Sequence, residues 1–254
     1  MIFREEIDVI SNKKKAFAVP IIIDLIGLII AILFFKYKTI SVLSIRPAIS
    51  IGLPSINTVL HPVNQFLTYN YGDDLQVALL FVAIIWFFVG AFIQAGYLCY
   101  LVDEFTTRSA DFATFIQAGR HFFLRFLLVG LITVPLSFVI GLIIVLFNTF
   151  GIILGFVLLL VLRIIFIYWE ITIVSDDVGV ISALFISREY FRKRVPETIN
   201  VIVFILLMNM GFSLVINYIP FIPVYTIGII LYGYCASVLN GTLFLSLDLI
   251  KTCN

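Results

Sequence analysis

Residues 122–173 of this chain read FFLRFLLVGLITVPLSFVIGLIIVLFNTFGIILGFVLLLVLRIIFIYWEITI. A helix of about 20 mostly apolar residues crosses the roughly 30 Å hydrocarbon core of a bilayer, so this stretch is long enough to cross it twice. Asn148 and Gly151 lie near its centre, and both residue types favour helix ends. The stretch therefore predicts two membrane-spanning helices, 122–147 and 151–173, joined by a tight hairpin.

The composition of the whole chain extends this interpretation. Hydrophobic residues make up 62% of the 254 positions, charged residues 12%, and the mean hydropathy is +1.17. A typical soluble domain is about 45–50% apolar and about a quarter charged, so a water-soluble core could not bury this excess. We therefore expect a single integral membrane domain over 1–254, with the lipid bilayer as its solvent. Its fold class is all-α, a polytopic bundle of transmembrane helices with added amphipathic interfacial helices.

Six apolar stretches approach the length of a transmembrane helix. Asn217 and Pro220 separate the last two, and Pro223 stands where a helix can begin without losing a hydrogen bond. No small-residue cleavage site follows the first stretch, so we interpret it as a retained span rather than a signal peptide. The six predicted spans are 16–35, 75–101, 122–147, 151–173, 199–217 and 221–247.

Lysine and arginine are distributed unequally between the two sides of this predicted bundle. With a cytoplasmic amino terminus, the three outer basic residues are Lys36, Lys38 and Arg46. Cytoplasmic loops of membrane proteins carry an excess of such residues. We therefore predict a multi-pass protein of the cell membrane with both termini cytoplasmic. The twelve inner basic residues are Arg4, Lys13, Lys14, Lys15, Arg108, Arg120, Arg125, Arg188, Arg192, Lys193, Arg194 and Lys251.

Two inner segments, 110–122 and 177–193, share a polar start, an apolar stripe and a basic end. Such helices lie in the membrane interface, where lysine and arginine meet anionic headgroups. We expect Phe115, Leu184 and Phe185 to face hydrocarbon or the bundle. A cytoplasmic extension of the neighbouring spanning helix fits the pattern equally well. The similarity of the two segments suggests a duplicated unit of span, surface helix and span.

The outer segment 36–74 combines three prolines with apolar residues at helical spacing after Ser55. This spacing predicts one surface helix. We interpret the segment as an amphipathic linker resting on the membrane. The alternative is that it covers the outer mouth of a cavity or contacts a partner.

The run from Glu170 to Arg188, EITIVSDDVGVISALFISR, together with six spans and short outer hairpins, resembles a broad group of uncharacterised prokaryotic membrane proteins. That group is similar to the membrane domain fused to some glycerophosphodiester phosphodiesterases, and the resemblance covers most of the chain from about residue 75. It implies membrane location and a six-helix architecture. No phosphodiesterase domain is present, so the resemblance implies no catalytic residue.

Motifs for catalysis and for cofactors are missing from the sequence. There is no GxxxxGK[ST], GxGxxG or GxSxG pattern. His61 and His121 have no Cys, Asp, Glu or His partner at metal-binding spacing. We therefore predict no catalytic residue, no metal site and no cofactor, and we expect neither enzymatic activity nor a nucleic-acid partner.

Three charged residues lie at membrane depth in the first and fourth predicted spans: Asp24, Arg163 and Glu170. Such groups are costly in lipid and indicate function by default. Counting about 1.5 Å per residue places Asp24 and Arg163 at similar depth, so we predict that they pair or share a polar cavity. Alternatively, Arg163 reaches inward to Glu170, which otherwise anchors the inner end of its helix beside Tyr168 and Trp169.

Small residues give a weaker signal. Gly151 and Gly155 form a GxxxG motif, and Gly90–Gly96 is rich in glycine and alanine. Such patches let helices approach closely. Packing inside one bundle and assembly into a homo-oligomer explain them equally well.

Three functions from different classes fit these observations. The first is a non-enzymatic membrane protein, either transporter-like or an accessory subunit that binds a membrane-protein partner. The second is a transporter of a small substrate or lipid, which requires a cavity around Asp24 and Arg163. The third is an enzyme acting on lipid headgroups at the inner interface, with candidate carboxylates Asp103, Glu104, Asp111, Glu170, Asp176 and Asp177.

Overall fold

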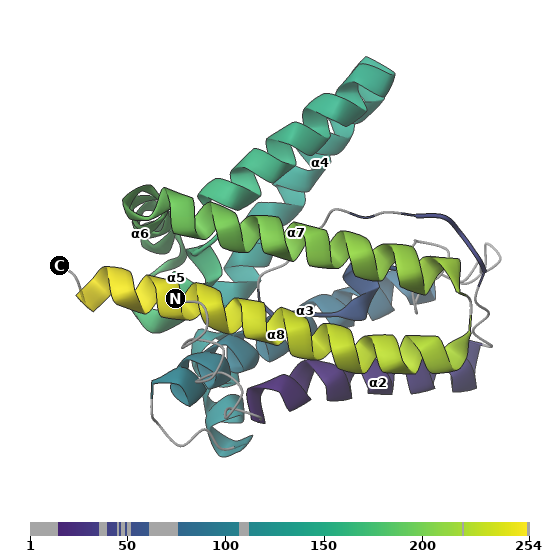
Figure 1. Cartoon of the computed structure of the whole chain (residues 1–254), viewed down its shortest axis with the longest axis horizontal. Coiled ribbons are helices and arrows are strands. Elements are labelled where there is room, and N and C mark those ends of the chain that lie inside the picture. The colour runs from purple at the N-terminus through teal and green to yellow at the C-terminus, as the bar shows by residue number, and fades with distance from the viewer. Residues whose placement is uncertain are drawn as a thin grey trace.

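A computed structural model shows an all-α fold, which confirms the predicted fold class. It describes residues 15–35, 40–44, 46, 49, 52–60, 76–106, 112–219 and 221–252. These ranges contain seven α-helices, one short 3-10 helix and no β-strand (Figure 1). The elements are α2 (Lys15–Phe35), η1 (Ile56–Thr58), α3 (Gln76–Phe105), α4 (Phe112–Ile165), α5 (Trp169–Ser175), α6 (Val180–Lys193), α7 (Val195–Tyr218) and α8 (Ile222–Thr252).

Apolar helices dominate the described part of the chain and make it an integral membrane protein. Four helical stretches are long and apolar enough to cross a membrane: Ile84–Phe105, Phe112–Ser175, Val195–Tyr218 and Ile222–Asp248. A shorter apolar helix, Phe17–Leu33, packs against the last of them. Large apolar side chains cover the outside of these helices, a surface that soluble proteins rarely present.

The helix α4 contains the hairpin that its sequence predicts. Asn148 has φ 51° and ψ −128°, which breaks the helix there. Beyond the break the chain folds back on itself. The close approach of the two halves shows this, since a Cβ at Gly155 would lie 3.1 Å from the side chains of both Ile140 and Ile144. Gly151 packs equally closely against the backbone of Ile144. The GxxxG motif therefore serves packing inside the hairpin, which extends away from the other helices (Figure 1).

Glycines also set the contact between α3 and the first half of α4. A Cβ at Gly96 would lie 3.0 Å from the ring of Phe115, and one at Gly119 would lie 2.8 Å from the ring of Phe92. Each phenyl ring thus occupies the space that a side chain would need. Packing within the bundle therefore explains Gly96, one of the small residues of the patch in the second predicted span.

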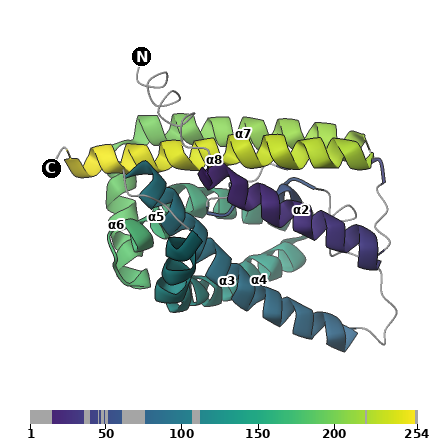
Figure 2. The ribbon, with the colours of Figure 1, turned by 90° about the horizontal axis from the view of Figure 1, so that it is seen from below.

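The two inner segments differ in the structure. Residues 112–122 belong to α4 and continue without a break into the apolar part of that helix, with Phe115 buried in the core. The segment 177–193 instead forms the separate helix α6, which crosses the end of the bundle transverse to α7 and α8 (Figure 2). The first segment is therefore the helix extension, and the predicted duplicated unit is not seen in these two segments.

Residues 40–60, as far as they are described, form what we call the inserted segment. Its residues Ile56, Val59 and Leu60 are completely buried, and only η1 within it is helical. The prediction of a linker resting on the membrane surface is wrong for this part, because the chain enters the bundle and packs against α2 and α8. The rest of the expected surface helix, from His61 onward, lies outside the described residues.

Polar side chains and one backbone carbonyl of α7 hold the inserted segment in place. The backbone N–H of Val42 donates to the carbonyl of Asn217 at 2.9 Å, and the side chain of Asn217 donates to the carbonyl of Val59 at 2.9 Å. The N–H of Arg46 donates to Ser213 Oγ at 3.1 Å. Buried backbone groups need such partners, so these contacts allow irregular chain to lie inside an apolar bundle.

Candidate functional site

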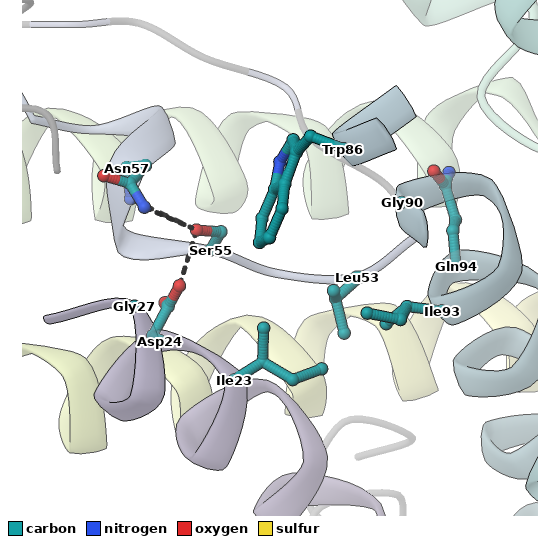
Figure 3. Close-up of a pocket in the computed structure, with 10 residues that line it drawn as sticks. All are labelled: Ile23, Asp24, Gly27, Leu53, Ser55, Asn57, Trp86, Gly90, Ile93 and Gln94. Atoms are coloured by element: carbon teal, nitrogen blue, oxygen red, sulfur yellow. Dashed lines mark hydrogen bonds between the residues drawn. The ribbon is translucent and has the colours of Figure 1, made fainter. Parts of the chain in front are cut away.

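Asp24 lies on α2 and binds the start of η1. Ser55 Oγ donates to Asp24 Oδ1 at 2.6 Å (Figure 3). The backbone N–H of Ile56 donates to Asp24 Oδ2 at 2.6 Å. Ser55 also caps η1, since its Oγ accepts from the N–H of Asn57 at 3.3 Å. The carboxylate thus fixes the point at which the inserted segment turns into η1.

A cavity of about 340 Å³ opens beside Asp24, between α2, α3 and the inserted segment. The oxygen- and nitrogen-bearing side chains come from three elements, and apolar side chains complete the wall. Small-molecule sites commonly combine an apolar wall with a few polar groups in this way, at volumes of about 300–1,000 Å³. The lining residues are Ile23, Asp24, Gly27, Leu53, Ser55, Asn57, Trp86, Gly90, Ile93 and Gln94 (Figure 3).

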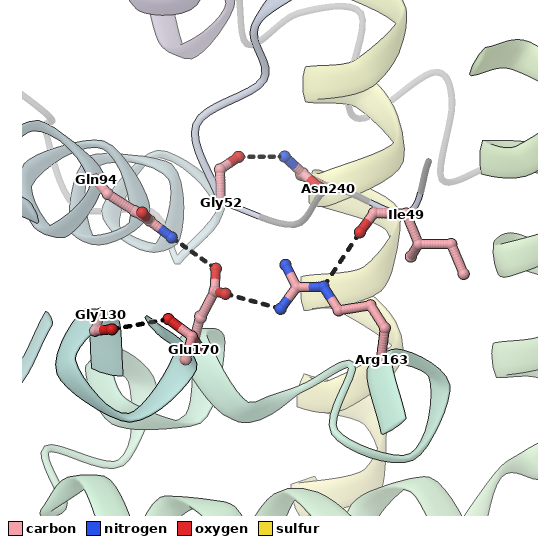
Figure 4. Close-up of polar contacts among 8 residues, drawn as sticks. Ile49, Gly52, Gln94, Gly130, Arg163, Glu170 and Asn240 are labelled. Carbon is pink, nitrogen blue, oxygen red and sulfur yellow. Dashed lines mark hydrogen bonds and ion pairs between the residues drawn. The ribbon is translucent and has the colours of Figure 1, made fainter. Parts of the chain in front are cut away.

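A second polar cluster joins the end of α4, the start of α5 and α3. Arg163 Nη1 forms an ion pair with Glu170 Oε1 at 2.9 Å, and Gln94 Nε2 donates to Glu170 Oε2 at 2.7 Å (Figure 4). Arg163 Nε donates to the carbonyl of Ile49 at 3.1 Å. Because Glu170 is only 6% exposed, its interpretation as an interfacial anchor is wrong, and it is a buried partner of Arg163.

The ion pair spans the break between α4 and α5. Residues seven apart on an unbroken helix are separated by roughly 10 Å along its axis. Here α4 ends at Ile165, and residues 166–168 form a turn before α5 begins at Trp169. Arg163 and Glu170 lie on either side of this turn, and their side chains meet directly, with 2.9 Å between Nη1 and Oε1.

Gly52 brings the inserted segment against this cluster. Its φ is +98°, and a Cβ there would lie 2.6 Å from Gln94 Nε2 and 2.8 Å from Glu170 Oε2. Its carbonyl accepts from Asn240 Nδ2 of α8 at 2.7 Å (Figure 4). Only glycine has both the backbone freedom and the missing side chain that this position requires.

The structure separates the two charges that sequence reasoning paired. Asp24 binds Ser55 and the N–H of Ile56, whereas Arg163 binds Glu170 and the carbonyl of Ile49. The prediction of a direct Asp24–Arg163 pair is therefore wrong, and the alternative partner for Arg163 is confirmed. Both charges contact the same inserted segment, so one stretch of irregular backbone links them.

Several residues of the site escaped the sequence analysis. Gln94 and Asn240 are uncharged, and they lie in long apolar runs whose hydropathy hides them. An amide in a membrane span needs a hydrogen-bond partner, so each was a detectable signal. Ser55 was noticed only as a helix start, and nothing in its neighbourhood indicates that it meets Asp24, 31 positions earlier.

Two of the carboxylates that were predicted to lie on the inner side, Asp176 and Asp177, have structural partners. Arg125 Nη1 lies 2.6 Å from Asp177 Oδ1, and this hydrogen bond, aided by His121, lowers the pKa of Asp177. Tyr190 donates to Asp176 at 3.0 Å, and its burial together with that carboxylate raises the pKa of Tyr190 to about 12.

Asp103 lies beside two further cavities of about 250 and 470 Å³. Asp111 lies outside the described residues. The described residues contain no group of three or more His, Cys, Asp or Glu side chains that could hold a metal ion.

Comparison with known proteins adds no further guide to the site. No family model, curated protein or solved structure matches this chain. The relationship suggested by the run Glu170–Arg188 stays a prediction. The chemistry of the two polar clusters and the cavity must be interpreted from their own geometry.

Proposed function

We propose that this protein is a transporter-like membrane protein that binds a small solute in the cavity beside Asp24. The observation that supports this most strongly is the inserted segment, which brings irregular backbone and polar side chains into the apolar bundle. Such backbone is tolerated in membrane proteins where it is buried in protein or lines a water-filled cavity. Secondary transporters likewise build their binding sites at interrupted helices, and α4 and α5 are interrupted beside Arg163 and Glu170.

The cavity supports solute binding more directly than an accessory role. A subunit that acts only by packing needs no polar cavity, and its interior is stabilised by apolar side chains alone. Here Asp24, Ser55, Asn57 and Gln94 all line one cavity of about 340 Å³. The groups are positioned by hydrogen bonds from outside the cavity wall, as in a preformed binding site.

The membrane arrangement that accompanies this proposal has six spans. The hairpin in α4 divides Phe112–Ser175 into two crossings, and α2 adds one more to the four long apolar stretches. With the basic residues inside, both termini are cytoplasmic and the membrane is the cell membrane. Reporter fusions at Asp103 and Arg192 should then both be cytoplasmic. An external signal from either site contradicts this topology.

A relationship to the membrane domain fused to some glycerophosphodiester phosphodiesterases belongs to the same proposal. It is supported by the run Glu170–Arg188 and by the six-span arrangement. It concerns ancestry and architecture, and it assigns no catalytic residue.

Transport can be tested with purified protein in proteoliposomes. Uptake of four radiolabelled solutes, an amine, a neutral amino acid, a sugar and a monocarboxylate, is compared between the wild type and two leucine variants. A Cβ at Gly90 meets nothing within 4 Å and points into space at the cavity wall, so Gly90→Leu should fill the cavity without disturbing packing. Gly141 is equally open but lies in the α4 hairpin, so Gly141→Leu is the matched control.

We expect uptake of at least one solute by the wild type and by Gly141→Leu. Gly90→Leu should reduce that uptake to the level of protein-free vesicles. Equal uptake by both leucine variants, or uptake of none of the four solutes above protein-free vesicles, contradicts the proposed function.

A further inference from the structure

We infer that the solute bound beside Asp24 is a small organic cation, an amine that carries an apolar group. The inference rests on the proposed function, because it assigns the chemistry of the ligand in the same cavity. Three features of the cavity support it: an uncompensated carboxylate, an indole ring and the absence of basic side chains from the described part of the wall.

The charge of Asp24 lacks a cationic partner among the described residues. Its side chain is 96% removed from solvent, since Asp24 is 4% exposed, and both of its hydrogen bonds come from neutral donors. Arg163 is engaged with Glu170, and Arg46 donates to the carbonyl of Leu60. A buried carboxylate is costly without a compensating charge. A cationic ligand would supply that charge.

Trp86 provides a second recognition element for a cation. It extends from α3 toward Ser55 at the cavity (Figure 3), and 53% of its surface is exposed before any ligand binds. The face of an indole ring attracts ammonium groups more strongly than any other side-chain ring. A carboxylate and an indole lining one cavity therefore favour a cation and disfavour an anion.

The remaining wall determines what accompanies the positive charge. Ile23, Leu53 and Ile93 are apolar and suit a hydrocarbon group. The volume of about 340 Å³ is at the lower end for ligand pockets, so the ligand is small. A bare divalent cation is a poorer match, because Ca²⁺ takes about six to eight oxygen ligands and Asp24 is the only carboxylate among the described residues of the wall.

Three probes of similar shape separate charge from size: benzylamine, benzyl alcohol and benzoate. Their binding to the full-length protein in detergent is measured by calorimetry and by thermal unfolding. A charge-assisted contact with a buried carboxylate should make benzylamine bind about tenfold more tightly than benzyl alcohol, or better. Benzoate should bind more weakly than either.

Two substitutions at the site test the two recognition elements. Asp24→Asn should remove the advantage of benzylamine over benzyl alcohol. Trp86→Leu should weaken benzylamine by about fivefold and leave benzyl alcohol closer to its wild-type affinity. Because Trp86 is half exposed, its replacement keeps the test valid even where Asp24→Asn disturbs folding. Glu189→Gln, on the exposed face of α6, should change neither affinity.

The outcomes distinguish failure of this inference from failure of the proposed function. If the three probes bind with equal affinity, and Gly90→Leu abolishes their binding while Gly141→Leu keeps it, the cavity is a solute site without a preference for cations. That result overturns this inference and leaves the proposed function standing. Benzylamine binding that survives Gly90→Leu, or no binding of any probe, overturns the inference. The uptake assay with four solutes then decides independently whether the protein is transporter-like.

Discussion

Replacement of Gly52 by alanine should destabilise the protein far more than its single added methyl group suggests. The backbone of Gly52 has φ +98°, which is strained for any residue with a Cβ. The new Cβ would also lie 2.6 Å from Gln94 Nε2 and 2.8 Å from Glu170 Oε2. The two polar groups cannot both keep their places, so the hydrogen bond between them is lost or distorted.

The magnitude follows from these two effects. Strain at a backbone conformation of this kind costs about 1–3 kcal/mol. Loss of a hydrogen bond to a charged group costs about 1.5–3 kcal/mol more. The free energy of unfolding should therefore fall by about 2.5–6 kcal/mol, and Tm by about 5–24 °C for a chain of this size.

The assay is thermal unfolding of purified protein in one detergent, with Gly211→Ala as the control. A Cβ at Gly211 meets nothing within 4 Å, and the residue lies inside α7. Alanine favours a helix by about 0.8–1.0 kcal/mol over glycine, so the control should unfold at the same temperature or slightly higher. The reasoning about strain and contact at Gly52 would be refuted by a Gly52→Ala protein whose Tm lies within about 1 °C of the wild-type value.

Three further predictions concern the charged residues. Arg163→Leu alone should lower the free energy of unfolding by about 3–5 kcal/mol, because it leaves the buried Glu170 without its ion-pair partner, and the double variant Arg163→Leu/Glu170→Gln should lose less. Thermal unfolding shows which variant is less stable, and a double variant as unstable as the single one argues against the pair. Double-mutant cycles should find a coupling free energy of at least about 0.5 kcal/mol between Arg163 and Glu170 and close to none between Asp24 and Arg163. A stronger coupling between Asp24 and Arg163 contradicts the conclusion that these two residues belong to separate clusters. Because Arg125 lowers the pKa of Asp177, the contact between the two side chains stabilises the fold at pH values above the unfolded pKa of about 3.9, and this stabilisation is lost as the pH falls through the lower folded pKa. Asp177→Asn should therefore weaken the dependence of stability on acid pH, and identical acid unfolding of the variant and the wild type contradicts this prediction.

Local signals in the sequence were sufficient for the helices and for the α4 hairpin. Asn148 tolerates a positive φ better than most residues, and it stands where a doubled span must reverse. The break after Ile165 had no such signal, because residues 166–168 are Phe, Ile and Tyr and contain neither glycine nor proline. The sequence analysis therefore gave the Arg163–Glu170 contact only as the alternative to a pair between Asp24 and Arg163.

The inserted segment was beyond prediction for a different reason. Its burial depends on partners far along the chain, such as Asn217 and Asn240, which lie 158 and 188 positions from the carbonyls that they bind. The predicted depth of Asp24 in the membrane indicated that its carboxylate needs a partner. That depth could not reveal that the neutral donors of Ser55 and Ile56, rather than a charged side chain, bind the carboxylate.

The position of Asn240 on α8 has a consequence for biogenesis. The ribosome makes residues 40–60 long before α7 and α8, yet their backbone carbonyls at Val59 and Gly52 are satisfied by side chains of those later helices. During synthesis the early chain must keep these groups hydrated or bound to the insertion machinery. A membrane protein built this way closes its interior only after residue 240 has been translated, so the inserted segment takes its final place in the bundle as a late, post-insertional step.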